Sequence, residues 1–209
     1  MTRRPAPAPA RPYHHGDLKA ALLKEAETIL ETDGVQALTL RAAARAAGVS
    51  HAAPNNHFGD LTGLLSELAA AGFNRFSTAL MQAMDAAGDE PRQQRKAIGR
   101  AYVRFARAHP GLFALMFRGE RLDAARPALR EAIEGARRAL RSVVLARKSA
   151  ASLSPVQQAA QAATLWSLVH GFAVLLLDGR LDGMIGALPP KENADTLLEA
   201  VLAAARIGD

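Results

Sequence analysis

The sequence predicts an all-α protein, and three features of its 209 residues support that fold class. Alanine and leucine dominate the composition, and β-branched and aromatic residues are sparse, which favours helices over strands. Apolar residues recur at the three- and four-residue spacing that gives a helix one apolar face. Cysteine is absent, so neither disulfide bridges nor cysteine-based metal sites hold the fold. A chain of this length can form one or two compact domains with a substantial core.

The first fifteen residues differ from the rest in being rich in proline, alanine and arginine. Because alternating prolines cannot form a helix, residues 1–15 are expected to be a flexible basic arm. An amphipathic helix follows and is expected to end near Asp33-Gly34. Its apolar face consists of Leu18, Leu22, Ala26, Ile29 and Leu30.

Residues 39–58 carry the most informative pattern, two short helices joined by a tight turn. Thr39 is expected to cap the first helix and Ser50 the second. Gly48 stands where the first helix must end in a left-handed conformation, which glycine adopts without steric cost. The apolar residues of the first helix and the corner are Leu40, Ala43, Ala44, Ala47 and Val49. Such a unit fits the DNA major groove, but helical hairpins without a nucleic-acid role show the same pattern.

The remaining segments are also expected to be helical. Asp60 can cap a long helix, and Gly88-Asp89-Glu90-Pro91 begins another. Ser154-Pro155 combines a capping residue with proline at the first helical position. The expected helices span, in order, about residues 60–86, 91–109, 112–117, 124–148, 155–177 and 194–205.

This arrangement near the N-terminus resembles the TetR family of bacterial transcriptional regulators. The matching residues there are Ala26, Leu30, Gly34, Thr39, Leu40, Ala44, Ala47-Gly48-Val49-Ser50, His57-Phe58 and Leu64. Residues 109–117 (HPGLFALMF) and 165–171 (LWSLVHG) are similar to the family's C-terminal domain of the Trp and His-Gly type. The resemblance implies a helix–turn–helix DNA-binding domain over residues 16–76 and an effector-binding and dimerisation domain over residues 77–209.

The resemblance also implies a transcriptional regulator, commonly a repressor, that binds a near-palindromic double-stranded DNA operator. Hydroxyls at helix N-termini favour phosphate, asparagine can pair with adenine, and alanine can contact a thymine methyl group. The expected DNA contacts are Thr39, Arg41, Ser50, His51, Ala52, Ala53, Asn55, Asn56 and His57, with Arg45 nearby and Arg3, Arg4 and Arg11 of the arm in the minor groove. A plain surface or capping role is the alternative for each polar residue.

Several positions depart from the family pattern. The family usually has a tyrosine where Asn55 stands, and an aspartate–lysine–glutamate run where Asp60-Leu61-Thr62 stands. An aromatic and a basic phosphate anchor are therefore missing. Pro54 removes a backbone donor and clashes with a preceding helical turn, so the second helix is expected to start late or to be distorted near Ala53. We expect weaker or unusual operator binding from these changes.

The segment from Pro155 to Leu177 is apolar on nearly all sides, so it must be covered on several of them. With the last helix it predicts a homodimer held by a four-helix interface, and the alternative is the central helix of a monomer. The resemblance implies a small-molecule effector that loosens DNA binding, and an apolar or aromatic one suits the residue types. Candidate pocket residues are Phe105, Phe113, Met116, Phe117, Trp166 and His170, although such a cluster is also typical of plain core.

The net charge of +6 is distributed unevenly along the chain. Residues 1–77 carry a balance of only +1, whereas residues 78–148 carry +8. The basic middle is expected to form solvated helix faces, with a patch that attracts an anionic ligand or DNA as the alternative. The basic residues on the expected faces are Lys96, Arg100, Arg104, Arg107, Arg130, Arg137 and Arg141.

Catalysis, a cofactor and a metal are not expected, because no Gly-rich phosphate loop, nucleophile elbow or HExxH motif is present. His14-His15-Gly16-Asp17, with His51 or His57, is the nearest approach to a metal site, but it lacks a fixed third ligand. The alternative functions are a helical metal- or ligand-binding protein and a helix–turn–helix module that binds protein. The start has no secretory signal, and the apolar part of residues 162–177 is shorter than the about 20 residues that span a membrane, so a cytoplasmic protein without a membrane partner is expected.

Overall fold

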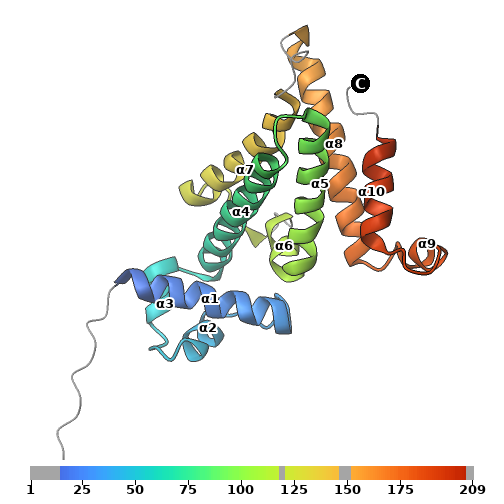
Figure 1. Cartoon of the computed structure of the whole chain (residues 1–209). Coiled ribbons are helices and arrows are strands. Elements are labelled where there is room, and N and C mark those ends of the chain that lie inside the picture. The colour runs from blue at the N-terminus through green and yellow to red at the C-terminus, as the bar shows by residue number, and fades with distance from the viewer. Residues whose placement is uncertain (1–14, 118–120, 146–151, 206–209) are drawn as a thin grey trace, which may run out of the picture. The chain divides into compact units, whose positions relative to one another are not determined.

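The computed structural model describes residues 15–117, 121–145 and 152–205, and every regular element in these ranges is a helix. This confirms the all-α fold class. The chain divides into two compact units, residues 1–64 and residues 65–209. Figure 1 shows the course of the helices, ten of them in the described ranges, and each unit is described by itself below.

The first unit contains three helices that pack on one another: α1 (His15–Asp33), α2 (Leu40–Ala46) and α3 (Ala53–Phe58). Helix α1 ends at the expected place, where Gly34 takes a left-handed φ of 80°. The three helices meet around a small apolar core. Its fully buried members are Leu22, Ala26, Leu30, Leu38, Ala43, Ala44 and Phe58. Ala43 and Ala44, the buried residues of α2, are small and so let α1 pack closely against this helix.

Helix α4 (Leu61–Ala86) begins in the first unit and continues into the second. The carboxylate of Asp60 accepts a hydrogen bond of 2.7 Å from the backbone N–H of Gly63, which confirms the predicted cap. Farther along α4, a Cβ on Gly72 would lie only 2.8 Å from Sδ of Met116. A larger residue at Gly72 would therefore require the side chains of Met116 and Leu112 to shift.

The second unit adds α5 (Pro91–Ala108), α6 (Pro110–Phe117), α7 (Pro127–Leu145), α8 (Pro155–Leu177), α9 (Asp182–Gly186) and α10 (Ala194–Ala204). Helix α5 packs against α6, α7, α8 and α10, so it is the central element of this unit. Figure 1 shows it between α4 on one side and α8 and α10 on the other. Its buried face includes Ile98, Tyr102 and Phe105, and the rings of Tyr102 and Phe105 pack against Phe76 of α4.

Side-chain caps fix the starts of several helices in the second unit. Glu90 accepts hydrogen bonds from the backbone N–H groups of Arg92 and Gln93 at 2.9 and 2.8 Å. Ser154 and Gln157 form a capping box at the start of α8, as the Ser154-Pro155 pair predicts. The start of α7 differs from the prediction, because it begins at Pro127 and not near residue 124. Proline suits the first turn, where no backbone donor is required.

Part of the basic middle of the chain pairs with acidic residues. Arg100 donates a hydrogen bond of 2.7 Å to Glu199, and Arg107 donates one of 2.9 Å to Asp195. Both pairs join α5 to α10. Arg100 and Arg107 remain partly exposed, so they lie on solvated faces as expected, and what the sequence prediction lacks is their pairing with α10. The sequence could not indicate it, since the partners are far apart along the chain.

Helix α8 exposes more apolar surface than a helix inside a monomer normally does. Its buried residues are Leu165, Val169, Phe172 and Ala173, whereas Val156, Trp166, Val174, Leu175 and Leu177 are exposed. With 23 residues it is also long and apolar enough to cross a membrane, so the expectation drawn from residues 162–177 alone is corrected. One such helix is weak evidence for a membrane span, because exposed apolar helices also form protein interfaces.

Candidate nucleic-acid interface and ligand cavity

The turn between α2 and α3 has the geometry that the sequence predicts for its first half. Thr39 Oγ1 accepts a hydrogen bond of 3.0 Å from the backbone N–H of Ala42 and so caps α2. Gly48 has φ +67°, and the N–H of Val49 donates to the carbonyl of Ala44 at 3.0 Å. The N–H of Gly48 donates to the carbonyl of Arg45 at 3.2 Å, which completes a Schellman motif. The corner is therefore fixed by backbone bonds.

The second half of the turn differs from the prediction at Ser50. Helix α3 begins at Ala53, its N-cap residue is Ala52, and no side chain caps it. Ser50 contributes its carbonyl oxygen, which accepts a hydrogen bond of 3.0 Å from the N–H of Ala53. The late start of α3 confirms the expected effect of Pro54. Because Pro54 lies in the first turn, no preceding turn exists for its ring to clash with.

The residues predicted to contact DNA lie on the accessible side of α2, the turn and α3. Pro54 and Phe58 are buried and hold α3 onto the unit. Ala53 and His57 are half-buried. The exposed residues of the set are Thr39, Arg41, Ser50, His51, Ala52, Asn55 and Asn56, and Arg45 is exposed as well. Helix α3 therefore buries one face and presents the other to the solvent.

Two cations on this surface are available for an anionic partner. Arg41 and Arg45 are four residues apart on α2, which places them on one helix face. Neither forms an ion pair with another residue in the described parts of the chain. The arm with Arg3, Arg4 and Arg11 lies outside the described residues, as do His14 and the side chains of His15 and Asp17.

In the second unit, a hydrogen-bonded chain joins Trp166, Tyr102 and His170. Trp166 Nε1 lies 3.3 Å from the Tyr102 hydroxyl, and this hydroxyl lies 2.9 Å from Nδ1 of His170. The indole N–H can only donate, so the tyrosine oxygen accepts it and its own proton points to His170. Burial lowers the pKa of His170, which favours the neutral ring that this bond requires. Burial also raises the pKa of Tyr102, so the phenol stays protonated.

An aromatic cluster surrounds this chain. The His170 ring lies 4.7 Å from Phe117 and 5.6 Å from Phe113, measured between ring centroids. The Tyr102 ring lies 4.9 Å from Phe76 of α4. Trp166 and His170 share a face of α8, as their four-residue spacing predicts, and their centroids are 6.2 Å apart. The cluster therefore connects α4, α5, α6 and α8.

A cavity of about 580 Å³ opens beside this cluster, within the size range of small-molecule sites. Three of the six expected effector residues line it, namely Met116, Phe117 and Trp166. Phe105 and Phe113 are buried and His170 is half-buried, and none of the three reaches the cavity wall. The other lining residues are Phe73 of α4, Ile133, Glu134, Ala136, Arg137, Leu140 and Arg141 of α7, and Ala159, Ala162 and Ala163 of α8.

The contribution of α7 to the cavity is absent from the sequence prediction. In the sequence, the apolar residues and arginines of α7 have the pattern of any amphipathic surface helix. They form a cavity wall only because α7 packs against α8. Ala159, Ala162 and Ala163 of α8 are a weak sequence indication of a cavity, since small residues on a helix leave space beside it.

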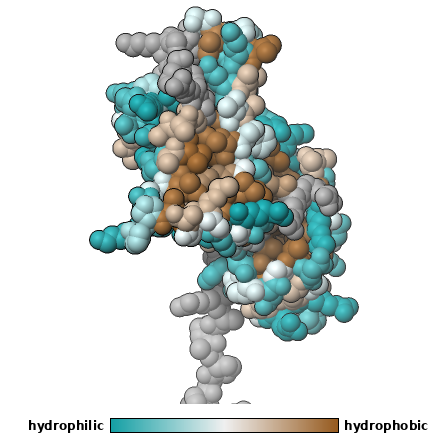
Figure 2. Space-filling model, turned by 90° about the vertical axis from the view of Figure 1, so that its right-hand side faces the viewer, coloured by the Kyte–Doolittle hydropathy of each residue, from teal (hydrophilic) through white to brown (hydrophobic). Residues whose placement is uncertain are grey.

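A hydrophobic surface lies on the side of the second unit where α8 and α10 run. Figure 2 shows brown side chains gathered on the face turned to the viewer, which is the side of α10 in Figure 1. On α8 this surface includes Leu175, whose side chain is 41% exposed, and the nearby Val174 and Leu177. Ala160, Thr164, Ser167 and Gly171 follow one another along the same side of α8 at four- and three-residue spacing. Small residues of this kind allow another helix to approach closely.

Residues 95–204 match the family model described as the C-terminal domain of tetracyclin repressor-like proteins. The chain belongs to the TetR family. It is thus a DNA-binding transcriptional regulator. Regulators of the TetR family bind DNA and small-molecule effectors and act as dimers.

Solved structures resemble this TetR-family chain over nearly its whole length. A protein with unknown function from Rhodococcus sp. RHA1 is 36% identical, with a TM-score of 0.76, over 93% of this chain and 96% of that one. The TetR family transcriptional regulator PfmR from Thermus thermophilus shares the fold at 20% identity and a TM-score of 0.58, over 87% and 94% of the two chains. The fatty acid degradation regulator FadR from Bacillus halodurans shares it at 14% identity and 0.65, over 88% and 92%. No curated protein matches the chain.

Proposed function

We propose that this TetR-family regulator is a repressor that binds a near-palindromic operator as a homodimer and is released by a small effector. Residues 16–76 form the DNA-binding domain of this proposal, and residues 77–209 form the effector-binding and dimerisation domain. The observation that carries the proposal is the exposed surface of α2 and α3, which combines Arg41 and Arg45 with neutral hydrogen-bonding side chains. Arginines supply sequence-independent affinity for phosphates, and amides can read base edges.

The roles on this surface follow from position and chemistry. Thr39 and the turn at Ser50 and His51 face the phosphate backbone, where hydroxyl and free N–H groups bind oxygen. Asn55 and Asn56 are exposed on α3 and carry the base contacts, together with His57. Ala52 and Ala53 contact thymine methyl groups. Arg41 and Arg45 neutralise phosphates beside them.

The homodimer forms through the exposed apolar side of α8 together with α10. Burying Val174, Leu175 and Leu177 in a second copy removes apolar surface from water, which is the main favourable term in association. A twofold axis would present two α3 helices to successive turns of the major groove. Half-sites roughly 34–36 Å apart, or somewhat more, fit this arrangement. Covered in this way, α8 suits a soluble cytoplasmic protein and needs no membrane.

The effector binds in the cavity between α4, α6, α7 and α8, where Met116, Phe117 and Trp166 provide apolar and aromatic surface. Phe73 places α4 in the wall of this cavity, and α4 is one continuous helix that begins at Leu61 in the first unit. A ligand that favours a different position of α4 can therefore change DNA affinity. Such coupling is typically worth about 1–3 kcal/mol, or a 5–150-fold change in affinity.

Selection of bound fragments from random duplex DNA tests the proposal with the full chain. We expect enrichment of a near-palindromic sequence with two half-sites about one helical turn apart. The variant Asn56→Ala should lose part of the sequence preference, whereas Gln36→Ala, an exposed change in the loop before α2, should leave it intact. Failure to enrich any sequence would reject the operator-binding role and favour a module that binds protein.

A further inference from the structure

We infer that the effector is a small amphipathic anion, an organic carboxylate whose apolar body fills the cavity and whose charged group lies at its rim. This inference rests on the proposed function and specifies the ligand class of the same site. It is carried by the distribution of apolar and charged side chains over α7, which forms one wall.

The interior of the cavity is apolar on every helix that lines it. Met116 and Phe73 are buried at the wall, and Phe117 and Trp166 add aromatic surface. On α7, Ala136 and Leu140 are buried and Ile133 is half-buried. A ligand therefore gains affinity by placing an apolar body against these side chains.

The charged lining residues all come from α7 and lie on its more exposed side. Arg137 and Arg141 are exposed and one turn apart, while Leu140 and Ala136 of the same turns are buried. The apolar residues thus face the interior and the arginines border the opening. A ligand that satisfies both must have its polar group at one end.

The sign of the rim charge is positive. Glu134 accepts a hydrogen bond of 2.5 Å from Arg137, so these two charges compensate each other. Arg141 makes no ion pair with a described residue and supplies an uncompensated cation. A carboxylate is the simplest organic group that pairs with a guanidinium in two parallel hydrogen bonds. Because the rim is exposed, the anion can keep part of its hydration and loses little on binding.

The experiment compares anions with neutral molecules that have the same apolar body, by isothermal titration calorimetry on the full-length protein. The two pairs are decanoate with 1-decanol, and 2-naphthoate with 2-naphthol, so that aliphatic and aromatic bodies are both covered. We expect the anion of at least one pair to bind about tenfold more tightly than its neutral partner, the usual scale of one charge-assisted contact. The preference should shrink as salt is raised, since an exposed pair is screened.

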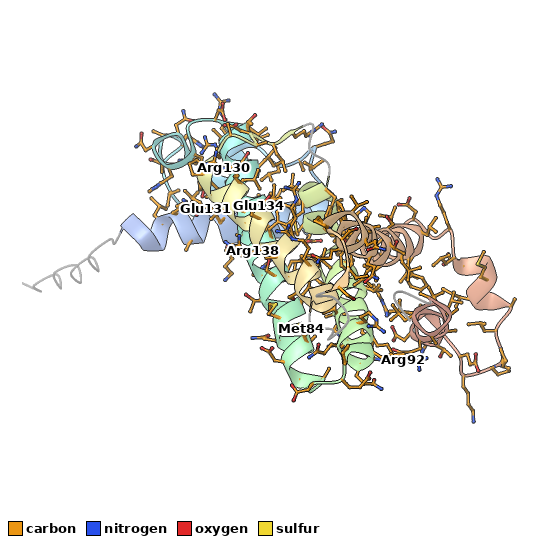
Figure 3. All side chains as sticks on the ribbon, turned by 90° about the horizontal axis from the view of Figure 1, so that it is seen from above. Met84, Arg92, Arg130, Glu131, Glu134 and Arg138 are labelled. Carbon is orange, nitrogen blue, oxygen red and sulfur yellow. The ribbon has the colours of Figure 1, made fainter. Side chains whose placement is uncertain are left out.

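Two substitutions on α7 locate the effect. Arg141→Gln should remove most of the preference for the anion and leave the affinity of the neutral partner unchanged. Arg138→Gln is the matched control, because Arg138 is exposed on the same helix but does not line the cavity. Figure 3 marks Arg138 on α7 together with Arg130 and Glu134. Ala162→Phe, which fills the cavity, should weaken both members of the pair.

The outcomes separate this inference from the proposed function. Equal affinities within both pairs, or an unchanged preference in Arg141→Gln, would overturn the anion inference while operator selection still tests the regulator. Selective binding of the anion without any change in operator affinity would support the ligand class and reject release by the effector.

Discussion

The hydroxyl of Tyr102 lies 2.9 Å from Nδ1 of His170 and joins the central helix α5 to α8. The same hydroxyl accepts the indole N–H of Trp166 at 3.3 Å, and Trp166 also lines the ligand cavity. One buried oxygen thus connects the cavity wall with the core of the second unit. Its removal tests how much this connection contributes to stability and to ligand binding.

The variant Tyr102→Phe keeps the ring and deletes only the hydroxyl. We expect the free energy of unfolding to fall by about 1–3 kcal/mol, because His170 Nδ1 loses its partner inside the protein. Denaturant unfolding measures the change. Tyr13→Phe, which also deletes one tyrosine hydroxyl but lies outside the described residues, is a control for the loss of a phenol. A Tyr102→Phe variant as stable as the parent would show that the bond contributes nothing.

Burial lowers the pKa of His170, and this gives the stability a defined dependence on pH. The unfolded chain binds a proton at His170 near its ordinary value of about 6.5, whereas the folded chain resists it. Since the unfolded state then carries more protons, stability decreases as the pH falls below that value. The loss between about pH 7.5 and 5.5 should be smaller in His170→Gln, which cannot titrate. Equal losses in both proteins would show that His170 does not cause the dependence.

The turn between α2 and α3 depends on Gly48, whose φ of +67° lies in the left-handed region. A Cβ at this position would meet no atom within 4 Å, so the cost of Gly48→Ala is backbone strain alone. We expect destabilisation by about 1 kcal/mol. Gly135→Ala is the contrasting variant, since it lies within helix α7 and an added Cβ would make only ordinary contacts, the nearest at 3.7 Å from Ser77 Oγ. It should leave the monomer unchanged or slightly more stable. Thermal unfolding of both variants measures the difference.

Local patterns predicted most of the fold because each depends on neighbouring residues. The positions of Gly34, Gly48 and Asp60 fixed three helix ends, and the structure has all three. Contacts between distant segments were beyond such reasoning. The ion pairs between α5 and α10 and the cavity wall formed by α7 arise only when the helices pack together. The residues next to Arg141 in the sequence do not distinguish it from an ordinary solvated arginine. The short helix α9 (Asp182–Gly186) is not predicted either, because a single turn is too short to show a periodic apolar pattern.

Ser50 shows the limit of a local rule. A serine before a short helix predicts a side-chain cap, but Pro54 shifts the start of α3 to Ala53 and moves the N-cap position to Ala52. The late start of α3 follows from Pro54, and the same shift leaves Ser50 outside the N-cap position. Whether Ser50 can cap α3 depends on where Pro54 makes the helix begin, so the two residues have to be interpreted together.

The exposed side of α8 should hold two copies together, which Leu175→Arg tests. An arginine there would bring two charges toward the twofold axis and leave them without partners, so we expect monomers at micromolar concentration. Light scattering after size-exclusion chromatography measures the mass. Thr78→Arg adds the same charge at an exposed position of α4, outside the proposed interface of α8 and α10, and should not change the mass. A parent protein that is monomeric at every concentration would reject the homodimer.

The number of phosphate contacts determines how steeply operator affinity depends on salt. Each neutralised phosphate contributes a slope of about −0.9 in a plot of log affinity against log salt. With Asn55 and Leu61 at positions where the family usually has tyrosine and lysine, we expect few contacts and a shallow slope. A slope as steep as about −10 would contradict that expectation.

Arg45→Gln should reduce the slope by about one and weaken all duplex sequences alike, because a phosphate contact carries no sequence information. Arg130→Gln, an exposed change on α7 outside residues 16–76, serves as the control for lost charge.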